Sequence, residues 1–160
     1  MPTTEKIKVL SPLAYRWAKS QEEFVFKFGV PLGRSQLLDA QLAGVLDPAR
    51  VRVLVVDRIP LPENQELAEA ARSAQIITGA SRVVTVGHGI LVRADSWRDR
   101  ETLLHGLVHV AQCERSGGLK LFVDKYIVDR ATCADFSVGS LEDEARQLAQ
   151  RICAGHAAAR

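Results

Sequence analysis

The sequence has little cysteine and little net charge. Its three cysteines, Cys113, Cys133 and Cys153, are odd in number and widely spaced, which argues against a disulfide framework and favours a reducing compartment. Twenty-one basic and 19 acidic residues leave a formal net charge of +2. A chain with so small and so interspersed a charge has no electrostatic footprint for nucleic acid or for an anionic membrane. We therefore expect neither as a partner.

Long apolar runs are also missing. No stretch approaches the length of a membrane-spanning helix, and the N-terminal residues contain no apolar run followed by a cleavage site. We expect no secretory signal and a cytoplasmic location. The apolar fraction of 47% and the charged fraction of 25% are typical of a globular protein. A chain of 160 residues is long enough to bury one core without cross-links.

The order of the predicted elements indicates a single α+β domain over residues 1–160. Residues 1–48 form a helical N-terminal part, residues 50–93 a small antiparallel or mixed sheet with one helix, and residues 97–155 three helices. The first helix is expected to begin at Ser11 as N-cap and Pro12 as first helical residue. The predicted apolar stripe of this helix consists of Leu13, Trp17, Phe24 and Phe28. A second helix is expected over residues 35–46.

Residues 51–56 are rich in valine and predict a buried strand that ends before two prolines. An amphipathic helix is expected over residues 63–77. Two short apolar runs, 83–86 and 90–92, flank the turn Gly87-His88-Gly89 and predict a β-hairpin.

Three helices are predicted in the last third of the chain. The first runs from about Trp97 to Arg115 after an Asp95-Ser96 cap, and it is apolar nearly all round, which is typical of a buried helix. The second has an apolar stripe from Leu119 to Ile127. The third is capped by Ser140, with Asp143 in the capping-box position.

His105 and His109 lie four residues apart in the predicted buried helix. Both imidazoles therefore project from one face, one turn apart, where two histidines can bind one Zn²⁺. The alternative is that each histidine forms a hydrogen bond to a carbonyl or carboxylate in the core. The pattern alone leaves both interpretations open.

Gly106 occupies a position of particular chemical interest. In hydrolytic zinc sites with this spacing, the residue after the first histidine is a glutamate that acts as general base. Glycine inside a helix costs about 1 kcal/mol relative to alanine, so local stability does not account for it. We expect Gly106 to remove the base and to leave an open slot beside the metal.

Four motifs carry a resemblance to a known family: LLHGLVHVAQCERSGG, the later LEDEA, the strand VRVLVV with its following prolines, and the GHGI hairpin. Together they resemble small bacterial zincin-like proteins of the metallopeptidase type. The family helix typically reads His-Glu-Leu-Val-His-Val-x-Gln-x-Glu-Arg, so this chain departs from it at Gly106. The resemblance covers roughly residues 51–149 and implies a zincin-like fold with a buried His-x-x-x-His helix.

The same resemblance implies Glu142 as the third metal ligand, as in zincins whose third ligand is a glutamate on a later helix. Glu144 remains an alternative, because the two carboxylates flank the apolar stripe of their helix almost symmetrically. Both also have a structural explanation, since carboxylates in a first helical turn are favoured by the helix dipole.

No neighbour is a convincing replacement for the missing base. Glu101 lies one turn too far along the axis, Glu114 is expected to pair with arginine or solvent, and Cys113 cannot share one ion with both histidines because three such residues span about 12 Å. Accessory roles are open for Gln112, Tyr126 and His88. Their structural alternatives are a solvent-facing amide, a core aromatic residue and an ordinary turn histidine.

Three functions are consistent with these observations. The favoured one is a degenerate metallopeptidase-like protein that keeps a Zn²⁺ site and binds a peptide or protein without efficient hydrolysis. The second is a metal-free structural or protein-interaction domain on the same scaffold. The third is an active metallopeptidase with a non-standard base, although removing a general base ordinarily costs a factor of about 10² to 10⁴. By analogy with zincins, residues 90–92 offer a strand edge for peptide pairing.

Overall fold

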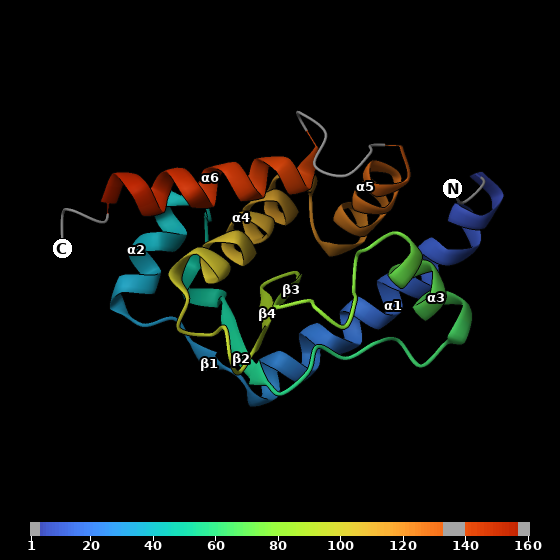
Figure 1. Ribbon diagram of the computed structural model, residues 1–160, viewed down its shortest axis with the longest axis horizontal. Helices are drawn as coiled ribbons and strands as arrows, with labels where there is room; N and C mark the ends of the chain where they lie inside the picture. The colour runs from blue at the N-terminus through green and yellow to red at the C-terminus, as the bar shows by residue number, and fades with distance from the viewer. Residues whose placement is uncertain (1–3, 133–139, 157–160) are drawn as a thin grey trace.

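The computed structural model describes residues 4–132 and 140–156. The described residues form six α-helices, one 3₁₀ helix and a four-stranded mixed sheet, which confirms the α+β class (Figure 1). The helices are α1 (Thr4–Phe28), α2 (Arg34–Leu42), η1 (Pro48–Arg50), α3 (Gln65–Ser73), α4 (Arg100–Ser116), α5 (Leu119–Thr132) and α6 (Leu141–His156). The strands are β1 (Val30–Pro31), β2 (Arg52–Val56), β3 (Val83–Val86) and β4 (Gly89–Arg93).

The sheet has the order β1-β2-β4-β3, with β2 and β4 parallel and the two outer pairings antiparallel. The predicted hairpin of β3 and β4 is confirmed. However, the expectation that residues 90–92 form a free edge is wrong, because β4 is paired on both sides. Strand β4 pairs with β2 on one side and with β3 on the other, so β3 lies at one edge of the sheet and β1 at the other.

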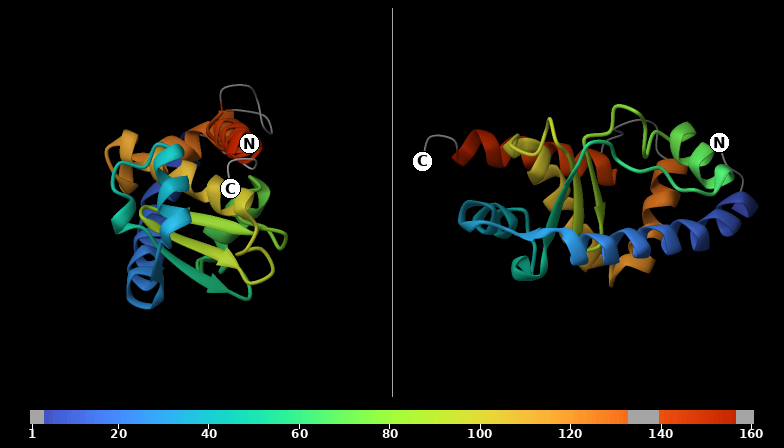
Figure 2. Two further views of the ribbon diagram at one scale, coloured as in Figure 1. Left: turned by 90° about the vertical axis from the view of Figure 1, so that its left-hand side faces the viewer. Right: turned by 90° about the horizontal axis from the view of Figure 1, so that it is seen from below.

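Side chains alternate between the two faces of the sheet, and each face has its own core. On one face, Val53, Ile90 and Val92 pack with residues of α2, α4 and α6. On the other face, Leu91 packs with Val25 of α1 and with residues in and after α3. Figure 2 shows α1 along one side of the sheet and α4 with α6 on the other. The buried helix α4 therefore lies between the sheet and α6.

The first helix is longer than predicted and buries a different stripe. It begins at Thr4 and runs through Pro12, whose side chain is exposed. Leu10, Ala18 and Val25 are buried, whereas Phe24 and Phe28 are 48% and 55% exposed. The prediction is therefore wrong for Phe24 and Phe28 but holds for Trp17, which is partly buried against the Leu91 core. At Gly89 a Cβ atom would lie 3.1 Å from Cβ of Val25, so helix and sheet approach too closely there for a ring.

Several helix ends also differ from the predictions. The α2 helix ends at Leu42 rather than at residue 46, before Gly44, which has a φ of 93°. The α3 helix is shorter than predicted by two residues at its start and by four at its end. The N-cap of α4 is Asp99, whose carboxylate accepts a hydrogen bond from the Thr102 amide. The Asp95-Ser96 cap is therefore wrong, since Asp95 instead pairs with Arg93.

The cap at Ser140 is confirmed, because its hydroxyl accepts a hydrogen bond from the Asp143 amide at 3.1 Å. No helix in the described part of the chain is both long enough and apolar enough to cross a membrane. Cys133 lies outside the described residues, and Cys113 and Cys153 are free thiols.

Candidate metal centre

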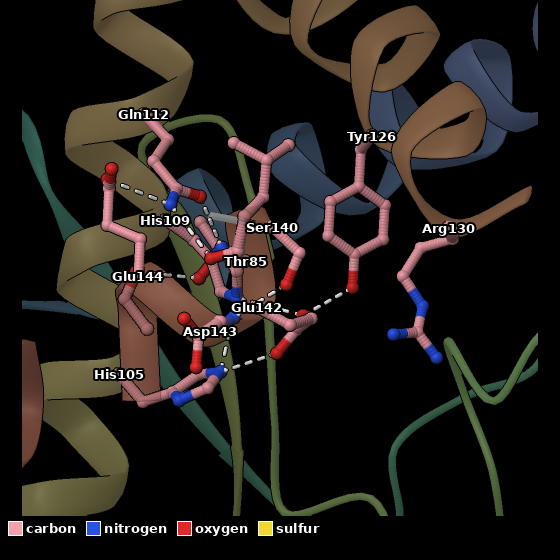
Figure 3. A network of polar contacts seen from close by, with 12 residues as sticks. Thr85, His105, His109, Gln112, Tyr126, Arg130, Ser140, Glu142, Asp143 and Glu144 are labelled. Carbon is pink, nitrogen blue, oxygen red and sulfur yellow. Dashed lines mark hydrogen bonds and ion pairs between the residues drawn. The ribbon is translucent and has the colours of Figure 1, made fainter. Parts of the chain in front are cut away.

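Helix α4 presents His105 and His109 on one face, and α6 brings Glu142 against them (Figure 3). The two Nε2 atoms are 3.2 Å apart. Oε2 of Glu142 is 3.0 Å from Nε2 of His105, and Oε1 is 3.1 Å from Nε2 of His109. One ligand atom from each of the three side chains lies within 4.8 Å of the other two, so this group could hold a metal ion. We call these three residues the candidate metal site.

Packing between helices fixes this geometry. Leu104 and Val108 of α4 and Ala145 and Ala149 of α6 are buried in the same core cluster. Because alanines face α4, the two helices can approach closely, and the first turn of α6 then meets the histidine face. The Ser140 cap fixes where that turn begins. Glu142 is thus held by the helix start rather than by a flexible loop.

Gln112 orients His109 from behind. Its amide nitrogen donates to the carbonyl of Leu141 at 3.0 Å and to Oε1 of Glu144 at 3.1 Å. Since both partners are acceptors, the amide oxygen must face His109, where it lies 2.8 Å from Nδ1. An amide oxygen only accepts, so Nδ1 carries the proton. In the neutral ring the lone pair therefore lies on Nε2, which points at the candidate metal site.

This arrangement distinguishes the two candidate carboxylates. Glu144 is exposed and is paired with Arg115 at 2.7 Å, in addition to its bond with Gln112. It belongs to the set of groups that orients Gln112 and lies outside the metal-binding group. Glu142 is the carboxylate that the structure brings to the histidines.

The electrostatics of the site call for a positive charge. The lone pair of His109 Nε2 faces a carboxylate oxygen of Glu142, and both are acceptors unless a proton or a cation lies between them. Burial acts to raise the pKa of Glu142. With a proton on Nε2 of each histidine, the hydrogen bonds from His105 and His109 and the charge of the two rings outweigh burial and hold the pKa of Glu142 well below its ordinary value. Glu142 is therefore an anion at neutral pH.

Tyr126 supports Glu142 from α5. Its hydroxyl donates a short hydrogen bond to Oε1 of Glu142, and its ring lies edge-on to His109 with centroids 5.9 Å apart. Burial, followed by the negative charge and the hydrogen bond of Glu142, raises the pKa of Tyr126 well above its ordinary value. The side chain thus combines the two roles left open by the sequence, since its ring packs among other rings and its hydroxyl reaches the site.

Gly106 does not leave an open slot, and that expectation is wrong. A Cβ atom at residue 106 would lie 3.1 Å from Cγ2 of Val83, 3.4 Å from Cγ2 of Ile90 and 3.4 Å from Oγ1 of Thr85. In addition, the hydroxyl of Thr85 donates to the carbonyl of Gly106 at 2.8 Å. The glycine instead allows α4 to lie directly against the hairpin. Sequence reasoning missed Thr85, because a single threonine within an apolar strand belongs to no motif.

His88 lies away from the candidate metal site. Its Nε2 is 3.0 Å from Oε2 of Glu114, and its amide donates to Glu22 at 3.0 Å. The expectation that Glu114 pairs with arginine or solvent is wrong, because the same carboxylate also accepts the amides of Leu46 and Asp47. We call His88, Glu22 and Glu114 the Glu114 cluster.

A cavity of about 640 Å³ opens beside the candidate metal site. Its walls come from α1, α3, α5 and the edge strand β3, and the two histidines, Glu142 and Tyr126 lie on one wall. The sequence did not reveal this cavity, since its walls are assembled from residues between Lys6 and Glu142 that are far apart along the chain. The chain matches no protein-family model, no curated protein and no solved structure.

Proposed function

We propose that this protein is a zincin-like protein that holds Zn²⁺ through His105, His109 and Glu142 and binds a peptide beside it, with hydrolysis lost or impaired. The observation that carries this proposal is the convergence of three ligand atoms. One of them is Nε2 of His109, whose lone pair is fixed by the contact of Gln112 with Nδ1 of the same ring. Two imidazoles and one carboxylate are a donor set typical of zinc sites that keep an open coordination position. A cavity lined by the same three residues adjoins these ligand atoms.

Bound zinc supplies a Lewis acid and an acidified water, but hydrolysis also requires a group that accepts the proton. Gly106 has no side chain to do so. Tyr126, with its raised pKa, remains protonated at neutral pH, and Glu101 is exposed on the first turn of α4. We therefore favour binding over cleavage, and do not favour an active peptidase with a non-standard base.

A peptide partner is supported by the position of β3. This strand is an edge of the sheet, and all four of its residues line the cavity together with the two histidines. An edge strand offers unpaired main-chain groups with which an extended peptide pairs. Such a peptide would run along β3 and present its backbone to the candidate metal site.

A metal-free interaction domain is the alternative. It is favoured by one observation, which is that every member of the site already has a protein partner, including Gln112 for His109 and Tyr126 for Glu142. In that case a proton on the histidines, instead of a metal ion, balances the carboxylate.

Metal content separates these two functions. We expect protein purified without an affinity tag to contain about one zinc per chain, measured by inductively coupled plasma mass spectrometry. His109→Ala and Glu142→Gln should lose it, whereas the matched control Glu114→Gln, another buried glutamate 3.0 Å from a histidine, should keep it. Absence of zinc in the wild-type protein, together with a melting temperature that added zinc leaves unchanged, would establish the metal-free alternative.

A further inference from the structure

The cavity beside the candidate metal site is polar at one end and apolar over most of its walls. The polar end comprises the two histidines, Glu142, Tyr126 and Arg130, whose Nη2 donates to the carbonyl of Ala74. The apolar walls include Leu10 and Trp17 of α1, Leu67 of α3, and Phe122 and Ile127 of α5. The other charged side chains, Lys6 and Glu69, lie on exposed positions at the rim.

The backbone around the cavity restricts what can enter it. Beyond β3 the walls are mainly helices, whose interior amide and carbonyl groups are already bonded within each helix. The segment 74–77 after α3 also lines the cavity, and its amides donate to carbonyls of α3. A peptide segment there would bury main-chain groups without partners, which is unfavourable. A chain of methylene groups has no such groups and gains from contact with the aliphatic walls. The volume of about 640 Å³ lies within the range of cavities that take small ligands.

From this distribution we infer that the cavity binds the acyl chain of an amphipathic ligand whose polar head lies at the candidate metal site. The position of the head rests on the proposed function, whereas the site for the chain depends only on the cavity. A free fatty acid and an acylated peptide share this chemistry. The second would place its peptide part along β3 and its acyl chain between α1, α3 and α5.

Alkyl hydroxamates of increasing length test the inference, because the hydroxamate head chelates zinc and the tail reports on the cavity. Zinc-loaded protein is titrated with acetohydroxamate, hexanohydroxamate and dodecanohydroxamate. Each added methylene that enters the cavity should tighten binding by about three- to fourfold. The sequence has two tryptophans, and the Trp97→Phe variant keeps only Trp17, which lines the cavity. The fluorescence of Trp17 should therefore change when the long chain binds.

Two substitutions that fill the cavity provide the variants. Ala14→Phe on α1 and Ala70→Leu on α3 add bulk at two different helices of the wall, so the test survives if circular dichroism shows that one of them fails to fold. Either should abolish the dependence on chain length and leave acetohydroxamate binding unchanged. The matched control is Ala154→Phe, at an exposed position of α6 away from the cavity walls, and it should bind the whole series like the wild-type protein.

The outcomes separate the two proposals. Equal affinity for short and long hydroxamates would overturn the acyl-chain site while leaving the zinc site intact. If no hydroxamate responds to zinc, but dodecanoate binds zinc-free protein and Ala14→Phe prevents it, the cavity inference stands and the zinc site fails. The two sources are distinguished by comparing dodecanoate with an N-dodecanoyl dipeptide. A leucyl peptide hydroxamate is also compared with its N-dodecanoyl derivative. If both bind with the same affinity, the cavity takes a side chain instead of an acyl chain, and the inference is overturned.

Discussion

Helix α4 takes part in two histidine–glutamate contacts that have the same length and different surroundings. In the candidate metal site, His105 is 3.0 Å from Glu142, and in the Glu114 cluster His88 is 3.0 Å from Glu114. Both carboxylates are largely buried, with 14% and 9% of their side chains exposed. Distance and burial alone therefore do not distinguish a ligand-binding site from a structural contact.

The partners of each carboxylate make the difference. Glu114 accepts two backbone amides from the loop after α2, so it ties that loop to the end of α4. Among the described residues, the carboxylate of Glu142 contacts the side chains of His105, His109 and Tyr126, and it lines a cavity. Convergence of three ligand atoms beside a cavity is thus an arrangement that could hold a metal ion, whereas the bonds of Glu114 to backbone amides are those of a structural contact.

The largest expected difference between the two contacts is in the free energy of unfolding when each glutamate is removed. Glu114→Ala leaves two backbone amides and His88 without their acceptor, and we expect it to lower the free energy of unfolding by about 2–3 kcal/mol. Glu142→Ala should have its main effect in the presence of zinc, by removing the zinc-dependent part of the stability. Urea unfolding of both variants with and without zinc measures this. Glu69→Ala, which breaks an exposed ion pair with Arg72, is the control and should change stability by less than about 1 kcal/mol.

The role of Gln112 can be tested by zinc affinity. Gln112→Leu removes the acceptor that fixes the proton on Nδ1 of His109, and we expect zinc affinity to fall by about 10- to 100-fold, as is typical when the partner of a metal-bound histidine is lost. Competition with a chromogenic chelator measures the affinity. Gln150→Leu, at an exposed position of α6, is the control. Unchanged affinity in Gln112→Leu would show that packing alone orients the ring.

Gly106→Glu tests whether the absence of a base limits hydrolysis. On its own the substitution should destabilise the protein by about 1–3 kcal/mol, since the new Cβ lies against Val83. Combined with Val83→Ala, which removes the nearest methyl groups, it should recover stability and raise hydrolysis of an unfolded protein substrate. Val83→Ala alone is the matched control. If the double variant folds and binds zinc but cleaves nothing, the missing carboxylate is not what limits cleavage.

The smallest effect concerns Cys113, which lies near the Glu114 cluster. Burial and then the negative charges of Glu22 and Glu114 raise the pKa of this thiol to about 12. At pH 8 it should therefore resist iodoacetamide in the folded protein, since the thiolate is the reactive form. The less buried Cys153 should react faster. Mass spectrometry after labelling in buffer and in urea checks this, and equal labelling of both thiols in buffer would contradict it.

Much of the fold was accessible from local patterns, because most elements have one polar face or strong end signals. The hairpin, the buried character of α4 and the Ser140 cap are examples, and all are confirmed. The strand order was not accessible, since it depends on a parallel pairing between β2 and β4 across more than 30 residues. The buried stripe of α1 was missed because it is set by close contact at Gly89, which no pattern within the helix indicates.

The candidate site was predictable where helical spacing determines it. The four-residue separation of His105 and His109 places them together in any helix. Helical geometry alone did not separate Glu142, which the resemblance favoured, from Glu144, because only the three-dimensional contact of α6 with Gln112 assigns Glu144 a different partner. The partner of His88 could not be anticipated either, since Glu114 follows it by 26 residues and meets it through the packing of α4 against the hairpin.

The contact between Gly106 and Val83 has a consequence for how such chains vary over evolution. A carboxylate at residue 106 is compatible with a small residue at 83, and a β-branched residue at 83 is compatible with glycine at 106. The order of substitutions then matters, because a change at 106 is deleterious until residue 83 has shrunk. Among related sequences the two positions should covary, and a chain with valine at 83 should acquire a smaller residue there before it acquires a glutamate after its first histidine.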